Sequence, residues 1–301
     1  MYIEENPMDT VEKARTQDLQ RALLRTKEKY QLSGLALAVA YGKGKSQTIV
    51  AGTDEKGVPL AQNSLFPVAS ITKLAVALAV LRLSDRGLLS INDPLDKFVE
   101  DAAAASTGVT LRQLLTHSAG LPEFPADAWT YDASLHWQIQ AQACLKIPST
   151  NPGSQVSYSN VDYGLLAIVV ERLARLPYRE AVADLVIRPL GIEAYLGSEP
   201  PRLPVYIRDL PDKRVDTPLE TWNSPFWRGL GTSWGGMVTT PAGSLALLRA
   251  YQGLPAGFLR PETVRTASQD QTSGLGGGFP WLTWAACPWG LGPWIIAENM
   301  N

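Results

Sequence analysis

The sequence has 301 residues, of which 45% are hydrophobic and 19% charged, and its formal net charge is −2. These values are typical of an ordinary globular protein and exclude the strongly basic surface that binds nucleic acid or an anionic membrane. The two cysteines, Cys144 and Cys287, are too few for a disulfide framework or a zinc site of their own, so we expect both to be buried as small hydrophobic side chains.

The N-terminal segment is polar and acidic and has neither the basic nor the apolar region of a signal peptide. The longest apolar run, residues 74–81, is too short to cross a bilayer. We therefore expect a cytoplasmic protein without a membrane partner.

The first third of the chain predicts a helix, a hairpin and a second helix. Residues 11–32 place apolar side chains among charges at the spacing of an amphipathic surface helix. The apolar runs 35–41 and 48–51 flank a Gly-Lys-Gly turn and predict an antiparallel hairpin. The segment that begins "SITKLAVALAV" predicts a helix that is buried on nearly every side, with Gly87 as its C′ residue.

The remainder of the chain alternates helix signals with irregular segments. Thr110 and Gln113 form a capping-box pattern at the start of a helix, and Asn160 occupies the N-cap position of another. Residues 195–230 are rich in Pro, Asp and Arg and predict an irregular surface connection. A further helix should start near Pro241 with Thr240 as its N-cap, and the Gly- and Trp-rich end of the chain predicts strands and turns.

This order of elements predicts an α/β fold of the α+β kind. An antiparallel sheet would be built from both chain ends, residues 1–66 together with residues 232–301, and flanked by helices. Residues 67–231 would form a large, mostly helical insertion. No repeat, low-complexity tract or linker divides the chain into independent domains.

Ser70 and Lys73 are the first candidates for chemistry, because residues three apart on a helix share one face. A serine at a helix start lies near unpaired backbone N–H groups that favour a developing oxyanion. Its hydroxyl needs an adjacent base, and a lysine can serve when burial lowers its pKa. The alternative interpretation is a helix-start serine beside a lysine that reaches solvent, which is the commoner case for an isolated Ser-x-x-Lys pattern.

A second pattern, "YSN", places Tyr158 and Asn160 just before a helix, where a packed aromatic ring and a helix cap are the simple alternatives. The combination of "ASITK", "GLLSINDPL", "LLTHSAGLP", "YSN" and "GGMVTT" resembles the serine β-lactamase and penicillin-binding protein superfamily. The resemblance is closest to the class C β-lactamase-like branch, which includes D-aminopeptidases, D,D-carboxypeptidases and esterases. It covers the chain from about Leu32 to its final residues.

The resemblance implies a β-lactamase/transpeptidase-like fold, with the active site between the two domains, and a role for each motif residue. Ser70 would be the acyl-accepting nucleophile, Lys73 its base or electrostatic partner, and Tyr158 the proton shuttle to the leaving group. Since an unperturbed tyrosine has a pKa of about 10, Tyr158 would act as a base only if Lys73 stabilised its phenolate. Asn160 would bind Lys73 or the substrate amide. The implied reaction is acyl transfer through a serine ester, on an ester or amide such as a β-lactam or D-amino-acid peptide, without metal or cofactor.

The third motif of the family, Lys or His followed by any residue and Gly on a facing strand, is not found after Asn160. We find no counterpart of the family's last strands and C-terminal helix in the sequence, so we expect an open sheet edge covered by a second copy or a complementing chain. The alternative function is a catalytically impaired homologue that serves as a ligand-binding or assembly module.

His117 is expected to be a structural residue at a helix end, and His136 a surface residue.

Four tryptophans near the C-terminus, at 281, 284, 289 and 294, allow two interpretations. Packing between the sheet and its helices is the simpler one. The alternative is an apolar wall for the acyl or alcohol group of an ester, to which Trp222, Trp227 and Trp234 would contribute.

Overall fold

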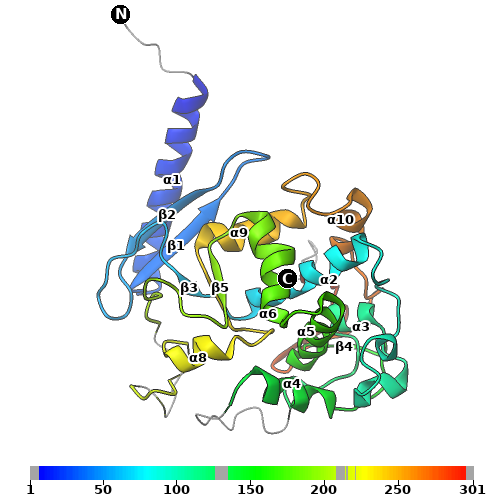
Figure 1. The fold of residues 1–301 in the computed structure, drawn as a ribbon. Helices are drawn as coiled ribbons and strands as arrows, with labels where there is room; N and C mark the ends of the chain where they lie inside the picture. The colour runs from blue at the N-terminus through cyan, green and yellow to red at the C-terminus, as the bar shows by residue number, and fades with distance from the viewer. Residues whose placement is uncertain (1–6, 126–134, 208–213, 215, 221, 296–301) are drawn as a thin grey trace, which may run out of the picture.

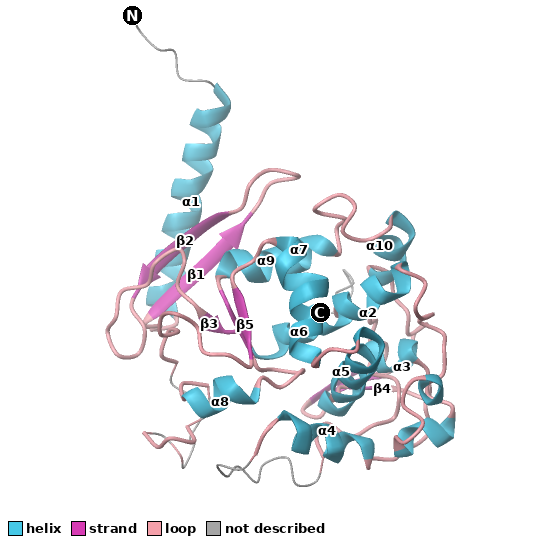
Figure 2. Ribbon diagram, in the orientation of Figure 1, coloured by secondary structure: helices cyan, strands magenta, loops and turns pink. Residues whose placement is uncertain are grey.

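The computed structural model describes residues 7–125, 135–207, 214, 216–220 and 222–295. Among these, the helices are α1 (Pro7–Lys29), α2 (Thr72–Asp85), α3 (Leu111–Leu115), α4 (Trp137–Leu145), α5 (Asn160–Ala174), α6 (Tyr178–Val182), α7 (Arg188–Leu190), α8 (Pro225–Leu230), α9 (Pro241–Ala250) and α10 (Pro261–Ala267). The strands are β1 (Gly34–Val39), β2 (Gln47–Gly52), β3 (Phe66–Pro67), β4 (Val156–Ser157), β5 (Ala194–Leu196), β6 (Met237–Thr239), β7 (Gly277–Phe279) and β8 (Leu282–Trp284). The predicted mixture of helices and antiparallel strands is confirmed (Figure 2).

The N-terminal helix and hairpin form as predicted. β1 and β2 pair antiparallel, with Leu35 opposite Ala51, and α1 lies along this hairpin at one side of the molecule (Figure 1). Leu23 of α1 packs against Ile49 and Ala51 of β2 in a small apolar cluster. The cluster explains why the amphipathic helix is stable here, because its apolar stripe is buried on the hairpin.

The strands are distributed over three small sheets, β1–β2, β3–β6–β5 and β4–β7–β8. The C-terminal strands β7 and β8 therefore join β4 of the helical region, and among the described strands β1 pairs with β2 alone. Glycine permits this arrangement: a Cβ on Gly277 would lie 1.9 Å from the Val156 carbonyl oxygen, across the parallel β4–β7 contact. The division into a sheet domain and a helical domain, and a partner chain at the open sheet edge, stay predictions.

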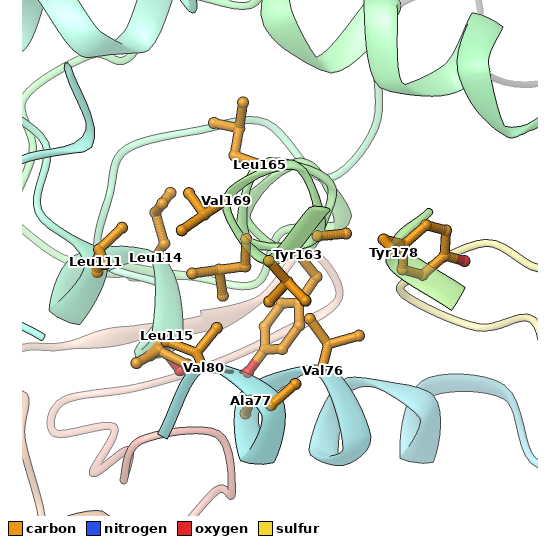
Figure 3. Close-up of a cluster of buried hydrophobic side chains, with 14 of the residues drawn as sticks. Val76, Ala77, Val80, Leu111, Leu114, Leu115, Tyr163, Leu165, Val169 and Tyr178 are labelled. Atoms are coloured by element: carbon orange, nitrogen blue, oxygen red, sulfur yellow. Dashed lines mark hydrogen bonds between the residues drawn. The ribbon is translucent and has the colours of Figure 1, made fainter. Parts of the chain in front are cut away.

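The largest core surrounds α2 and α5. α2 is buried on nearly every side, as its sequence predicts, and packs against α5, while α3 closes the core beside it (Figure 3). The labelled core side chains include Val76, Ala77, Val80, Leu111, Leu114, Leu115, Tyr163, Leu165 and Val169. α2 thus has a fixed place in the molecule, and its first residues follow directly on Ser70.

The ends of the helices follow local rules, with one correction. At the end of α2, Gly87 has a φ of 73°, and the Gly87 and Leu88 N–H groups return to the Ser84 and Leu83 carbonyls, as in a Schellman motif. The capping box at Thr110 and the cap at Thr240 are confirmed. The N-cap of α5, however, is Ser159 and not Asn160, because the Ser159 backbone is extended and its hydroxyl accepts the N–H of Asp162 at 3.2 Å.

The contact between α4 and α5 gives a test of the core. A Cβ added to Gly164 would lie 2.4 Å from Cys144 Sγ, whereas one added to the exposed Gly229 of α8 would meet nothing within 4 Å. Since overpacking a core costs about 1–3 kcal/mol, Gly164→Ala should lower the free energy of unfolding by that amount in a denaturant titration.

Gly229→Ala is the matched control and should be neutral or slightly stabilising. In Gly164→Ala/Cys144→Ala the clash with Sγ is absent, so the double variant should be more stable than the sum of the single effects. Equal stability of the Gly164→Ala and wild-type proteins would contradict the close packing of α4 on α5.

Candidate active site

Ser70 lies in a 3-10 turn, Ala69–Ile71, that leads into α2, so it precedes the α-helix proper by two residues. Its side chain is exposed. The preceding residue, Ala69, has a φ of 45°, which is strained for a side chain other than glycine and is found mainly where function requires it. The Thr72 hydroxyl holds the turn, since it donates to the Ala69 carbonyl at 2.6 Å and accepts the Met237 N–H at 3.0 Å.

Lys73 reaches the exposed serine from the protein interior. Its side chain is buried, and Nζ donates to Ser70 Oγ at 3.2 Å and to the Trp234 carbonyl at 2.9 Å. Nζ also lies 4.7 Å from the ring centre of Tyr158 and 5.7 Å from that of Tyr163. Among the residues that the structure describes, no carboxylate forms an ion pair with this amine, so the hydrogen bonds and the aromatic rings are its immediate partners.

Tyr158 completes a three-residue cluster with the other two. Its hydroxyl donates to Ser70 Oγ at 2.7 Å, so the serine oxygen contacts both an amine and a phenol. The Tyr158 N–H bonds the Gly278 carbonyl at 2.9 Å, which ties the tyrosine loop to β7. The structure therefore brings together Ser70, Lys73 and Tyr158 from separate segments, while their catalytic roles stay predictions.

Asn160 is the first residue of α5, two residues after Tyr158. Its N–H donates to the Glu123 carbonyl at 2.8 Å, and its side chain is largely buried. In the described part of the chain, Asn160 makes no hydrogen bond to Lys73, whose second acceptor is the Trp234 carbonyl instead. The role left to the Asn160 side chain is contact with a substrate, which stays a prediction.

Burial sets the protonation of the cluster. It lowers the pKa of Lys73 well below the ordinary lysine range, and the charges of Asp162 and Glu123 oppose this shift only in part. Burial also raises the pKa of Tyr158 to about 12, although the hydrogen bond to Ser70 works in the opposite direction. At neutral pH the phenol is thus protonated, and the amine is the group that burial drives toward a basic, neutral form.

A buried pair of side chains behind the site, His117 and Asp162, was not predicted from the sequence. His117 Nδ1 and Asp162 Oδ2 lie 2.8 Å apart, and both side chains are almost fully buried. The Ser159 N–H donates to the same Nδ1 at 3.1 Å. Burial raises the pKa of Asp162 well above its ordinary value and lowers that of His117, so it favours the uncharged form of both groups.

This buried pair supports the tyrosine directly, because the centres of the His117 and Tyr158 rings lie 4.6 Å apart. His117 is structural, as expected, but it is part of the site's support. Its position after α3 was visible in the sequence, whereas nothing in the spacing indicated that Asp162, 45 residues later, would meet it.

Burial tests the expectations for the two cysteines and for His136. Cys144 and Cys287 are free and buried, and His136 is exposed. Within the described ranges, no group of three His, Cys, Asp or Glu side chains could hold a metal ion. No described helix has both the length and the apolar character needed to span a membrane.

Comparison with known proteins places this geometry in context. A family model described as Beta-lactamase matches residues 11–294. Esterase EstB of Burkholderia gladioli is 31% identical over an alignment of 261 residues, and the match covers 74% of this chain and 65% of that protein. The D-alanyl-D-alanine-carboxypeptidase/endopeptidase AmpH of Escherichia coli K12 is 33% identical over an alignment of 143 residues, and the match covers 44% of this chain and 36% of that protein.

A solved structure of similar fold is EstCE1, described as a hydrolase with promiscuous acyltransferase activity. Its TM-score is 0.71 at 20% identity, over 95% of this chain and 84% of that one. At that identity the likeness shows the fold alone. The chain thus spans less than two thirds of the length of EstB and AmpH, and shares its fold with EstCE1.

The buried amine gives a prediction that does not depend on activity. Because the folded-state pKa of Lys73 lies below the 10.5 of an ordinary lysine, the wild-type folded state should lose stability as the pH falls from that value through the folded-state pKa. Lys73→Met removes this titration. Its melting temperature minus that of the wild type should therefore decrease as the pH rises from about 6 to about 9, measured by calorimetry. A difference that is constant or increases over this range would contradict the lowered pKa.

Proposed function

This chain belongs to the Beta-lactamase family, and from that premise we propose that it is a serine hydrolase that acts on small esters or amides through an acyl-enzyme at Ser70. The observation that carries the proposal is the position of Ser70 Oγ, exposed to solvent and in contact with Lys73 Nζ at 3.2 Å and Tyr158 OH at 2.7 Å. A hydroxyl between a base and an acid is the arrangement that acyl transfer requires.

In the first step, Ser70 Oγ attacks the substrate carbonyl while neutral Lys73 accepts the hydroxyl proton. The Ser70 N–H, in the 3-10 turn that leads into α2, is the donor for the oxygen that becomes negative. As the tetrahedral intermediate collapses, Tyr158 gives its proton to the leaving alcohol or amine. The resulting phenolate is stabilised by the Lys73 ammonium beside its ring.

The second step reverses these roles. Water attacks the acyl ester of Ser70 and gives a proton to the Tyr158 phenolate, and Lys73 returns the first proton to the departing Ser70 oxygen. The cluster is restored and the acid is released. Over the two steps, Lys73 and Tyr158 each gain and lose one proton, and both contact Ser70 Oγ in the structure.

The relatives limit the substrate class. One is named an esterase and the other a D-alanyl-D-alanine carboxypeptidase and endopeptidase, so an ester and a D-amino-acid amide are the two substrate types to compare. We favour an ester, because no charged residue lies in the aromatic segment 277–284 beside Tyr158.

A catalytically impaired homologue is the second candidate function. It is favoured by one sequence observation, the absence of a Lys or His followed by any residue and Gly after Asn160. Removal of a single oxyanion donor typically costs two to three powers of ten in rate, so such a homologue would bind acyl compounds with little turnover.

Replacement of the nucleophile distinguishes these candidates. The wild-type protein should gain one covalent adduct with a fluorophosphonate or a penicillin in intact-protein mass spectrometry, and should hydrolyse p-nitrophenyl acetate steadily. In Ser70→Ala the adduct should vanish and kcat should fall about 10³-fold or more. The exposed Ser106 supplies the control, since Ser106→Ala should behave as the wild type. An adduct that persists in Ser70→Ala would refute the assignment, and an adduct without turnover would support the impaired homologue.

The base assignment predicts a pH profile. If neutral Lys73 accepts the proton, kcat/KM should rise with pH through the lowered pKa of Lys73 and level off well below 10.5. Lys73→Arg keeps a cation that does not deprotonate, so it should lose about 10²-fold or more in kcat/KM at neutral pH. A flat profile together with near wild-type activity of Lys73→Arg would show that another group is the base.

A further inference from the structure

The β7–β8 hairpin is bonded to the same segment that carries Tyr158. β7 pairs with β4, and the Val156 and Tyr158 N–H groups donate to the Gly276 and Gly278 carbonyls, each at 2.9 Å. β8 returns antiparallel, with Leu282 opposite Phe279. These backbone hydrogen bonds fix the position of Phe279, the residue after Gly278, relative to Tyr158.

Aromatic rings continue outward from Tyr158 along this hairpin. The Phe279 ring lies 4.9 Å from the Tyr158 ring, and the Trp281 ring stacks on Phe279 at 5.4 Å with an interplanar angle of 18°. Because Tyr158 OH bonds Ser70 Oγ, the stack begins beside the reacting group. Trp281 is its last ring and is 71% exposed.

The other tryptophans of this region are used for packing. Trp289 is buried, its indole N–H donates to the Gly292 carbonyl, and it lies edge-on to His117 at 4.8 Å. Trp284 and Trp294 contact each other at 4.9 Å, and both meet the edge of Phe279. The packing interpretation thus holds for these three, whereas Trp281 presents its indole to solvent.

We propose that Phe279 and Trp281 form a subsite for the aromatic ring at the end of a substrate's alkyl arm, away from the scissile carbonyl. The inference rests on the proposed function, because it takes Ser70 as the reacting end of the substrate. The ligand is neutral and apolar, since residues 277–284 carry no charge and no carboxylate that would select a cation. An exposed indole stacked on a held phenyl ring offers a flat apolar surface at little conformational cost.

The spacing selects the probes. Trp281 lies two ring contacts beyond Tyr158, so a phenyl ring must be carried on an arm of several carbons to reach it. 4-Phenylbutyl acetate provides that arm, and butyl acetate has the same arm without the ring. The kcat/KM of acetate release is measured for both esters with the wild type, Trp281→Ala, Trp281→Phe and Tyr30→Ala, an exposed aromatic residue that follows α1.

Trp281→Ala should lower kcat/KM for 4-phenylbutyl acetate about threefold to tenfold more than for butyl acetate, mainly through KM, as expected for one aromatic contact. Trp281→Phe should restore most of the preference, and Tyr30→Ala should leave it unchanged. An equal loss for both esters would show a structural role of Trp281, and an unchanged preference would show no role. Either result overturns the subsite.

Binding without turnover separates this proposal from the catalytic one. In Ser70→Ala, ligand-observed NMR titration should give a Kd for 4-phenylbutyl acetate that increases about threefold to tenfold when Trp281→Ala is added, but not when Tyr30→Ala is added. If the wild type hydrolyses neither ester, these two are not its substrates, and this binding comparison still decides the subsite: an equal Kd with and without Trp281 refutes it.

Discussion

The burial of the Lys73 amine is the constraint on which the chemistry of this site depends. A lysine is seldom buried, because desolvation disfavours its charge. Here its Nζ is held inside the protein by the Trp234 carbonyl and meets the exposed Ser70 at the surface. α2 can place it there because that helix is packed on nearly every side, so the position of the amine is fixed by the core.

The charged neighbours of Lys73 oppose this effect only in part. Asp162 and Glu123 favour the cationic amine, but burial outweighs them and lowers the pKa of Lys73. Burial also raises the pKa of Asp162 well above its ordinary value, which reduces the negative charge that it offers the amine. Burial also keeps Tyr158 a protonated phenol. The Ser70 hydroxyl therefore contacts both an acid, Tyr158, and a base, Lys73.

Features that depend on neighbouring residues in the chain could be predicted from the sequence. The hairpin around its glycine turn, the end of α2 at Gly87, the capping box at Thr110 and the shared face of Ser70 and Lys73 all follow from local rules. The exchange of Asn160 for Ser159 as N-cap shows the limit of such rules, since both residue types cap helices and only the backbone conformation distinguishes them.

Features that depend on tertiary contacts could not be predicted from the sequence. The His117–Asp162 pair, the Trp234 carbonyl that receives Lys73, and the pairing of β7 with β4 join segments that no periodicity relates. The four tryptophans near the C-terminus illustrate the same point. Three of them pack against other aromatic rings and Trp281 is exposed, although all four looked alike in the sequence.

The state of the Lys73 amine is the most direct test of the account. With lysines labelled with ¹³C at Cε, the Lys73 resonance can be assigned by its absence in Lys73→Met and followed by NMR as a function of pH. We predict a titration midpoint for Lys73 well below the 10.5 of an ordinary lysine. A midpoint at or above 10.5 would contradict the burial of a neutral amine at this site.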